Sequence, residues 1–320
     1  MVSPLKDYMD ADVAYLLGLI IGRGTIYPSA GVRQIVIQFS YSLLEAQGIS
    51  SRFNVEDASR LGLDDIRERL QELLETDVQK NTRAGGVDLV IRFMRNNMIW
   101  RNILVLTDEQ VSFHYFRIPR IFFDDDLPVD WAREFVRGYA DVAGNIRESN
   151  RYIDGRRRVR LDVLNYPTNW KLALDLCHLL QEKLGVPVQN ITWGHPNMGR
   201  GFREHQLNVF AVPFLEVGFG LRYKHQILEE FAEDDMRHHS GSCSACYGIG
   251  SIRQKDSDPQ ESNTEKLPME LVGRHFNAYW QICRALGCER NRQGELDLGD
   301  LGQHDPEDPR EQGDIAGARV

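Results

Sequence analysis

The sequence predicts an α+β protein made of two similar halves, followed by a small cysteine-rich module and an acidic tail. Apolar residues recur at helical spacing in some segments and alternate with polar residues in others, so both helices and strands are expected. A helical segment with a glycine at Gly18 has a counterpart 120 residues later at Gly138, and such a repeat indicates two related halves. Beyond Glu233 the composition shifts towards His, Ser, Cys and Gly, which indicates a separate module.

These observations divide the chain into five expected segments. The connector between the halves contains two prolines and a run of three aspartates. The expected segments are a first half (1–116), a connector (117–130), a second half (131–233), a module rich in Cys and His (234–290) and a disordered acidic tail (291–320).

In the first half, the apolar run that ends at Gly22-Arg23-Gly24 predicts a helix over residues 13–22, with Asp12 as its N-cap. Residues 32–42 alternate between apolar and polar side chains, which predicts a strand with one apolar face. The other elements expected in this half are a helix over 61–77, a strand over 87–94 and a short helix over 98–106.

The second half repeats this order of elements. It begins with a helix over 131–139 that continues towards Gly144, and the turn-forming pair Asp154-Gly155 precedes a strand over 158–164. The remaining expected elements are a helix over 170–184 that ends at Gly185, a strand over 206–212 and a helical stretch within 214–233.

The charge is unevenly distributed along the 320 residues. The chain has 38 Lys+Arg and 47 Asp+Glu and a net charge of −9, and residues 291–320 hold eight acids but three arginines. This segment is poor in large apolar side chains, so it is expected to be disordered, and the rest of the chain can still carry a basic face. The apolar run at 13–21 is shorter than the about 20 residues that a membrane-spanning helix needs. Without a signal-peptide pattern, a cytoplasmic location and no membrane contact are expected.

The two glycine-containing helices carry a known pattern. Residues 16–24 are Leu-Leu-Gly-Leu-Ile-Ile-Gly-Arg-Gly, and residues 136–144 are Val-Arg-Gly-Tyr-Ala-Asp-Val-Ala-Gly. Both resemble the LAGLIDADG motif, so the chain resembles the LAGLIDADG homing endonuclease family over residues 10–230. The resemblance implies a pseudo-symmetric fold of two αββαββα repeats, whose motif helices pack side by side and whose four-stranded antiparallel sheets enter the DNA major groove. Gly18, Gly22 and Gly138 have no Cβ atom and are the expected helix-interface residues.

The chain departs from this family at the metal-binding positions. In the family, the acid before the last glycine of each motif holds a divalent metal, which stabilises the attacking and leaving oxygens of phosphodiester cleavage. Arg23 and Ala143 occupy these positions, and neither offers a metal ligand. Asp141 matches an earlier acid of the motif, so it is either a helix-end or solvated carboxylate or a residual catalytic acid. No catalytic residue is therefore expected, and magnesium has a role only if cleavage survives.

Arginines gather in the segments expected to form the sheets. Arginine binds phosphates and reads guanine through two parallel hydrogen bonds. Alternation places Arg158 and Arg160 on one strand face with Asp162. Two interpretations of Arg23 stay open, which are a plain surface arginine and a fixed positive charge where the family holds a metal. The alternative is that these arginines only solvate an exposed face. The candidate DNA-binding residues are Arg23, Arg33, Arg92, Arg95, Arg147, Arg151, Arg156, Arg157, Arg158 and Arg160.

Four of the five cysteines lie in the module over 234–290. Cys243 and Cys246 form a Cys-x2-Cys pair, and Cys283 and Cys288 follow. Four sulfur or imidazole donors fit tetrahedral zinc, and donors that all come from the protein are typical of a structural site. The alternative is that Cys283 is buried in a helix and that His239 completes the zinc site.

The sequence therefore predicts a protein that reads double-stranded DNA on a LAGLIDADG-type fold without nuclease activity, as a regulator or as the recognition component of a larger system. One alternative is a metal-dependent endonuclease of homing or restriction type, with a rearranged site that uses Asp141, Glu148 or an acid of the first half. A second alternative is a protein-interaction module. A protein partner that binds the C-terminal module or the tail is compatible with each of these functions.

Overall fold

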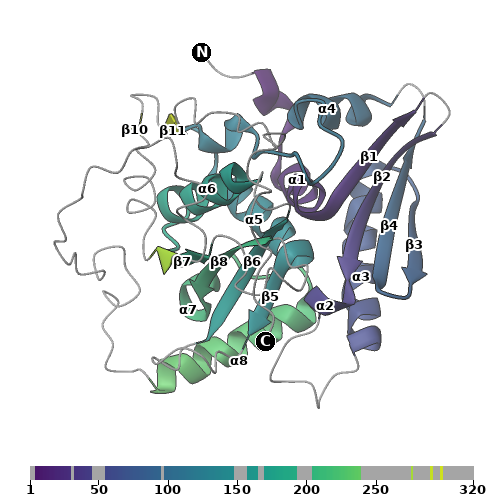
Figure 1. The fold of residues 1–320 in the computed structure, drawn as a ribbon. Coiled ribbons are helices and arrows are strands. Elements are labelled where there is room, and N and C mark those ends of the chain that lie inside the picture. The colour runs from purple at the N-terminus through teal and green to yellow at the C-terminus, as the bar shows by residue number, and fades with distance from the viewer. Residues whose placement is uncertain are drawn as a thin grey trace, which may run out of the picture.

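The computed structural model describes residues 4–29, 32–44, 55–94, 97–147, 157–164, 169–192 and 204–238, together with two-residue strands at 275–276, 289–290 and 296–297. Within these ranges the chain is an α+β protein with two large antiparallel sheets and one separate two-stranded pair, and the helices α1 and α5 lie between the large sheets (Figure 1). No helix in the described ranges is long and apolar enough to cross a membrane.

The first half forms one four-stranded sheet with helices beside it. The strands are arranged in the order β1-β2-β4-β3, and all neighbours are antiparallel. The elements in chain order are η1 (Pro4–Tyr8), α1 (Ala11–Arg23), β1 (Gly24–Ser29), β2 (Val32–Ser40), α2 (Tyr41–Leu44), α3 (Val55–Leu74), β3 (Val78–Arg83), β4 (Gly86–Phe93) and α4 (Met98–Leu106).

The second half follows the short helix η2 (Arg120–Phe123). Its sheet has the order β5-β6-β8-β7, and the two-residue strand β9 (His275–Phe276) adds to the β7 edge. The elements are α5 (Val129–Ala143), β5 (Gly144–Arg147), β6 (Arg158–Leu164), α6 (Trp170–His178), the π-helix η3 (Leu179–Lys183), β7 (Val188–Thr192), β8 (Glu204–Phe210), α7 (Ala211–Phe214) and α8 (Arg222–His238). The pair β10 (Glu289–Arg290) and β11 (Leu296–Asp297) is separate from both sheets.

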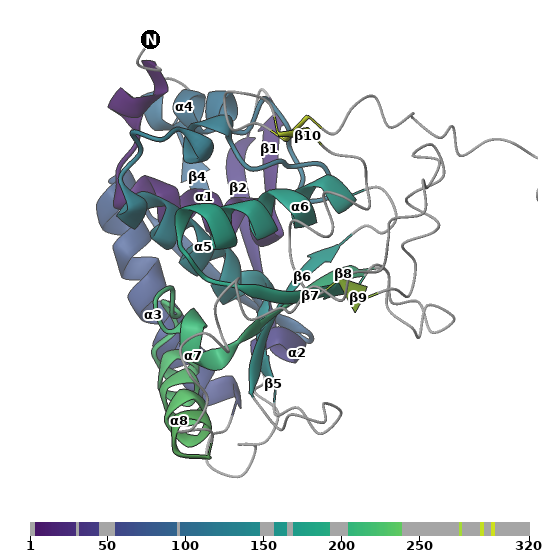
Figure 2. The same ribbon diagram turned by 90° about the vertical axis from the view of Figure 1, so that its left-hand side faces the viewer.

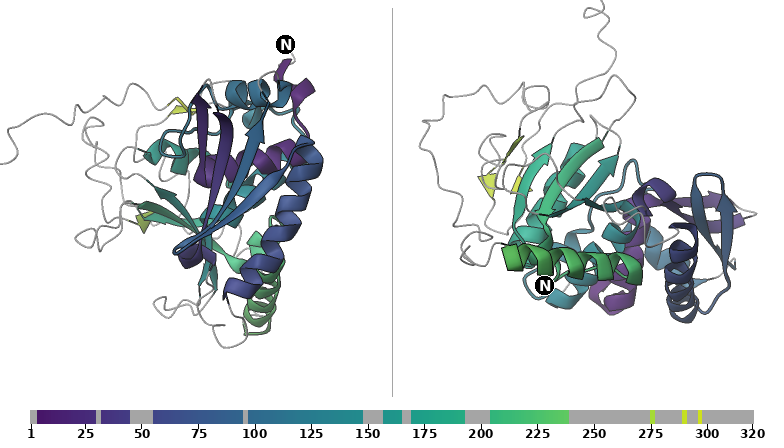
Figure 3. Two further views of the ribbon diagram at one scale, coloured as in Figure 1. Left: turned by 90° about the vertical axis from the view of Figure 1, so that its right-hand side faces the viewer. Right: turned by 90° about the horizontal axis from the view of Figure 1, so that it is seen from below.

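The two halves repeat one order of elements, which is a helix, two strands, a helix, two strands and a helix. The order β1-β2-β4-β3 in one sheet corresponds strand by strand to β5-β6-β8-β7 in the other. Figure 2 shows α1 and α5 side by side, and the right-hand view in Figure 3, seen from below, shows the sheets on either side of this junction. The pseudo-symmetry expected from the spacing of Gly18 and Gly138 is therefore present in the described chain.

The core of the first half lies between one face of the sheet and the helices. In β2, Ile35, Ile37 and Phe39 are fully buried, because every second residue of a strand points to the same face. Leu63 and Leu70 of α3 are buried at helical spacing against this core. The opposite face of the sheet is turned to the viewer in Figure 3, left, and no helix of the described chain lies in front of it. This second face is free to carry polar side chains.

The helices α1 and α5 are in close backbone contact at three glycines, which are Gly18 and Gly22 of α1 and Gly138 of α5. A Cβ atom at Gly18 would lie 2.0 Å from the carbonyl oxygen of Phe135, and one at Gly138 would lie 2.2 Å from the carbonyl oxygen of Tyr15. One at Gly22 would lie 2.4 Å from the side chain of Val142. Since Gly18 and Gly22 meet successively later residues of α5, the two helices run parallel and their C-terminal ends lie together.

Several predicted elements differ from the structure at their ends. The N-cap of α1 is Asp10 and not Asp12, because Asp10 is extended and its Oδ1 accepts a hydrogen bond from the Val13 backbone N–H at 2.7 Å. The helix predicted over 61–77 spans Val55–Leu74 instead. The strands β1, β3 and β7 were not predicted, because their sequences lack a clear alternation of apolar and polar residues.

The expected segment boundaries at 130 and 233 fall inside helices. The connector over 117–130 contains η2 and the first two residues of α5, and Ile118, Ile121 and Phe122 are buried in the core. Since α8 continues to His238, the second half extends beyond Glu233. The connector is therefore an integral part of the packed fold.

Candidate functional site

The two motif helices end in the same way. Gly24 (φ −90°, ψ 149°) and Gly144 (φ −91°, ψ 143°) both have extended backbones, and their N–H groups donate to the carbonyls of Ile20 and Ala140. The chain enters a strand directly after each helix. Arg23 and Ala143 are therefore equivalent residues at the parallel helix ends, where the resemblance would place metal-binding acids.

Arg23 is a buried cation at the end of α1. Its side chain is 6% exposed, and its Nη1 donates to the Gly22 carbonyl oxygen at 2.7 Å. The guanidinium lies 5.7 Å from the centre of the Phe113 ring, which is a favourable distance for a cation–π contact. Arg23 is thus buried against the end of α1. From the sequence alone, it could equally be an exposed surface arginine.

Asp141 is a buried structural carboxylate. It is 0% exposed and accepts hydrogen bonds from the Tyr15 hydroxyl at 2.6 Å and from the backbone N–H groups of Gly220 at 3.0 Å and Leu221 at 3.1 Å. Burial raises the pKa of Asp141, and these hydrogen bonds and the nearby Lys224 oppose that rise. The carboxylate therefore joins α1, α5 and the loop before α8, and it is not solvated.

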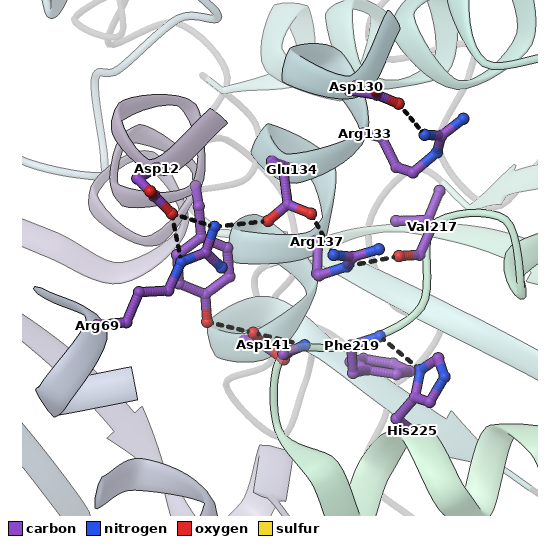
Figure 4. A network of polar contacts seen from close by, with 12 residues as sticks. Asp12, Arg69, Asp130, Arg133, Glu134, Arg137, Asp141, Val217, Phe219 and His225 are labelled. Atoms are coloured by element: carbon purple, nitrogen blue, oxygen red, sulfur yellow. Dashed lines mark hydrogen bonds and ion pairs between the residues drawn. The ribbon is translucent and has the colours of Figure 1, made fainter. Parts of the chain in front are cut away.

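A second network joins the same helices to α3 (Figure 4). Arg69 donates to Asp12 of α1 at 2.7 Å and to Glu134 of α5 at 2.9 Å, and its guanidinium lies 4.1 Å from the centre of the Tyr15 ring. Glu134 also pairs with Arg137, which donates to the Val217 carbonyl oxygen at 2.8 Å. Asp12 therefore pairs with Arg69 instead of capping its own helix.

Lys224 of α8 is buried at the end of α5. The side chain is 1% exposed, and Nζ donates to the carbonyl oxygens of Gly144 at 2.7 Å and Asp141 at 3.4 Å. Burial lowers the pKa of Lys224 to about 8; the carboxylates of Asp141 and Asp162 oppose this change, and Arg23 adds to it. Lys224 was not among the predicted site residues, because no local pattern in 222–238 shows that this lysine points inward.

We predict that the stability of the protein rises with pH as Lys224 titrates. The folded state loses this proton near pH 8 and the unfolded chain near pH 10.5, so between these values the unfolded chain binds more protons. Chemical denaturation across this range should therefore show a free energy of unfolding that increases with pH relative to a Lys224→Met variant. If the free energies of unfolding of the native chain and the Lys224→Met variant changed equally with pH, the buried position of the ammonium group would be wrong.

The described residues do not fit a divalent metal at the helix ends. Arg23 and Ala143 supply no ligand, and the oxygens of Asp141 already accept from one hydroxyl and two backbone N–H groups. No group of three or more His, Cys, Asp or Glu residues that could hold a metal occurs in the part of the chain that the structure describes. Glu148, the other acid named for a rearranged site, lies outside the described residues.

The outward face of the first sheet carries a row of polar residues across three strands. Antiparallel pairing places Tyr27 of β1 opposite Gln34 of β2, and Gln34 opposite Arg92 of β4. Tyr27 and Arg92 are exposed, and Gln34 is half-buried. A ring, an amide and a guanidinium group thus lie side by side on the face that no described helix covers.

A second polar row crosses the same face four residues further along β2. Gln38 lies opposite Asp88 of β4, and Asp88 lies opposite Asn81 of β3. Arg83 of β3 donates to Asp88 at 2.9 Å, and Gln79 is exposed between the two rows. The predicted DNA contacts did not include Gln34, Gln38, Gln79 and Asn81, because these amide side chains carry no charge. The sequence also does not show which strands are neighbours.

The second sheet has a polar row in which Asn145 of β5 lies opposite Arg160 of β6, and Arg160 lies opposite Asn208 of β8; Asn145 and Asn208 are both buried. Arg160 is 8% exposed, and its guanidinium contacts the Asp162 carboxylate at 2.7 and 2.8 Å. Arg158 is 2% exposed, contacts Gln189 and lies 4.9 Å from the centre of the Phe210 ring. Both arginines are therefore more buried and more engaged than alternation along β6 predicts.

The other candidate arginines differ in their surroundings. Arg157 pairs with Asp234 of α8 at 2.7 Å, and its backbone N–H donates to Asp235 at 2.8 Å, so it connects β6 to α8. Arg33 is half-buried. The side chain of Arg147 and the whole of Arg95, Arg151 and Arg156 lie outside the described residues, as do the candidate zinc ligands Cys243, Cys246, Cys283, Cys288 and His239.

Comparisons with solved structures find LAGLIDADG proteins as structural neighbours. A set of variants of the homing endonuclease I-DmoI has 15% sequence identity and a TM-score of 0.37 over 67% of this chain and 95% of that chain. Full-length DUF199/WhiA from Thermatoga maritima has 16% identity and a TM-score of 0.40 over 72% of this chain and 60% of that chain. The N-terminal LAGLIDADG domain of DUF199/WhiA has 14% identity and a TM-score of 0.37 over 65% of this chain and 81% of that chain.

One of the I-DmoI structures is a complex with DNA and Ca. A scan against protein-family models and a search of curated proteins found no match. The fold description of this chain therefore rests on its own element order, sheet topology and helix pair.

Proposed function

We propose that this chain is a sequence-reading double-stranded DNA-binding protein that does not cleave DNA. The observation that carries the proposal is the outward face of the first sheet, where two polar rows cross neighbouring strands. One row holds Tyr27, Gln34 and Arg92, and the other holds Gln38, Asp88 and Asn81. The row of Asn145, Arg160 and Asn208 on the second sheet is buried, so the exposed surface that supports the proposal is that of the first sheet. The arginine and alanine at the helix ends support binding without cleavage, as expected of a degenerate LAGLIDADG protein.

The chemistry of these side chains matches the edges of base pairs in the major groove. Glutamine and asparagine form paired hydrogen bonds with adenine, and arginine does so with guanine. Same-face residues along a strand are spaced by roughly 6.8 Å, since each residue rises about 3.4 Å. This is close to two base-pair steps of about 3.4 Å each. Gln34 and Gln38 are two such spacings apart, roughly 14 Å, which matches about four base-pair steps, so both can address bases in register.

Arg92 is the candidate arginine whose exposed position on a sheet face is best suited to DNA contact. Arg83 on the same face forms an ion pair with Asp88, and this carboxylate offsets the attraction of Arg83 for a phosphate. The remaining arginines of the sequence-based set stay proposed contacts, with Arg158 and Arg160 in a supporting position beside Gln189 and Asp162. The first sheet is therefore the surface to test.

We expect the full chain to bind duplexes selected from a randomised pool, with an affinity that falls as salt rises. Each neutralised phosphate contributes about 0.9 to the slope of log K against log salt. Replacing Arg92 by alanine should weaken binding by about 1–3 kcal/mol. An Arg222→Ala variant is the matched control, because Arg222 is an exposed arginine on α8 and not on a sheet.

Three outcomes would contradict parts of this proposal. Equal losses in the Arg92 and Arg222 variants would mean that the first sheet is not the binding surface. Strand cleavage that depends on magnesium would favour the endonuclease alternative. No binding above background at low salt would favour the protein-interaction alternative.

A Gln34→Ala and Gln38→Ala double variant should alter the selected bases while leaving the salt slope unchanged, which separates base reading from phosphate binding.

The proposal of structural zinc in residues 234–290 rests on the spacing of Cys243, Cys246, Cys283 and Cys288, with His239 as an alternative ligand. Magnesium has no role in the proposed function. A protein partner for the module or the acidic tail also remains a proposal.

A further inference from the structure

Two buried cations lie at the parallel ends of the motif helices, one at each helix. Arg23 Nη1 donates to the Gly22 carbonyl oxygen of α1, and Lys224 Nζ donates to the Asp141 carbonyl oxygen of α5 and to Gly144 directly after it. Because α1 and α5 run parallel and their C-terminal ends lie together, both cations lie at the same end of the helix pair. The arrangement is therefore one centre with two positive charges.

The positions of these charges have a clear electrostatic reason. The C-terminal end of a helix carries a partial negative charge, because its last carbonyl groups have no partner within the helix. Two parallel helices that end together bring two such ends into one buried region. A cation that donates hydrogen bonds to these carbonyls both satisfies them and opposes their charge.

The two halves reach this result by different routes. In α1 the cation is Arg23, the residue before Gly24. The equivalent residue of α5 is Ala143, which has no charge, and the cation comes instead from Lys224 of α8. The carboxylates of Asp141 and Asp162, on α5 and β6, favour the charged form of Lys224, and Asp162 also pairs with Arg160.

We propose that Arg23 and Lys224 form a built-in cation pair that takes the place of divalent metal at the helix ends, so that this chain folds and binds DNA without a divalent ion. The part of this inference that concerns DNA rests on the proposed function. The part that concerns folding rests on the contacts of the two cations alone.

The first test is thermal unfolding of the full chain with chelator, with excess Mg²⁺ and with excess Mn²⁺. We expect the same melting temperature in all three conditions for the native sequence. An Arg23→Asp and Ala143→Asp double variant places two carboxylates at the helix ends, and its melting temperature should rise with Mn²⁺. A native chain stabilised by a saturable divalent ion, or a folded double variant insensitive to Mn²⁺, would overturn the proposal.

The second test does not depend on the folding of that double variant. The Lys224→Met variant keeps an unbranched side chain of similar length but removes the ammonium group. Its melting temperature should be lower, because the carbonyl groups of Gly144 and Asp141 lose their hydrogen-bond donor. Lys80→Met is the matched control, since Lys80 forms a partly exposed ion pair with Asp64 that contributes little to stability. Equal melting temperatures for the two variants would overturn the proposal.

The DNA measurement separates this inference from the proposed function. Affinity for the selected duplex should be the same in chelator and in Mg²⁺ at matched ionic strength. Binding that requires Mg²⁺ would overturn the metal-free centre while leaving DNA binding intact. If no DNA binds in either condition, the proposed function fails, and the melting experiments still decide whether the cation pair replaces a metal.

Discussion

Replacing Gly138 by alanine should lower the free energy of unfolding by about 3 kcal/mol, at the upper end of the cost of overpacking. The added Cβ atom would lie 2.2 Å from the Tyr15 carbonyl oxygen and 3.2 Å from the Leu19 nitrogen, and both are backbone atoms that cannot rotate away. The two helices would have to separate. Urea denaturation of the native chain and the variant measures the loss.

The matched control for this prediction is Gly85→Ala. A Cβ atom at Gly85 would have Arg83 Nη1 at 3.5 Å as its nearest neighbour, which is an ordinary contact, so we expect a change below about 1 kcal/mol. If the Gly138 and Gly85 variants lose the same stability, the close backbone contact between α1 and α5 is wrong.

Replacing Asp141 by alanine should lower the free energy of unfolding by about 3–5 kcal/mol, the range for removing one partner of a buried charged pair. The change leaves the Tyr15 hydroxyl and the N–H groups of Gly220 and Leu221 without their acceptor, and it removes one of the two carboxylates that favour the charged form of Lys224. Urea denaturation again measures the loss. An Asp88→Ala variant, which breaks the more exposed pair with Arg83, should lose less than about 1 kcal/mol.

The Asp141 variant also distinguishes a structural role from a catalytic one. A structural carboxylate lowers stability when it is removed, and any DNA affinity falls only as the folded fraction falls. A variant of native stability that loses magnesium-dependent DNA cleavage would instead assign Asp141 to an active site. The complete set of hydrogen-bond donors around the carboxylate favours the first result.

The elements that the sequence predicted well are those whose pattern is local. The short helix over 98–106 was predicted with the bounds that α4 has, and the strand over 32–42 has the buried face that its alternation indicated. The edge strands β1 and β3 escaped prediction for a physical reason. Their sequences, GTIYPS and VQKNTR, have little apolar alternation, and their extended form depends on hydrogen bonds to β2 and β4.

The candidate site shows the same division between local and tertiary information. Arg23 could be singled out from the motif, because its position after Gly22 is a matter of sequence alone. Lys224 could not, because its partners Asp141 and Gly144 lie about 80 residues earlier and meet it only when α8 packs beside α5. Gln34 and Arg92 likewise become neighbours only through the register of β2 and β4.

By itself, the sequence determined that two glycine-containing helices repeat, that their ends carry Arg23 and Ala143 in place of acids, and that the strands are rich in arginine. These properties belong to single residues and short spacings. The tertiary structure decided which charges are exposed: Arg92 is on an open sheet face, whereas Arg158, Arg160 and Lys224 are buried beside their partners. The physical reason is that burial and ion pairing depend on neighbours far away in the chain, and only the packed fold brings those neighbours together.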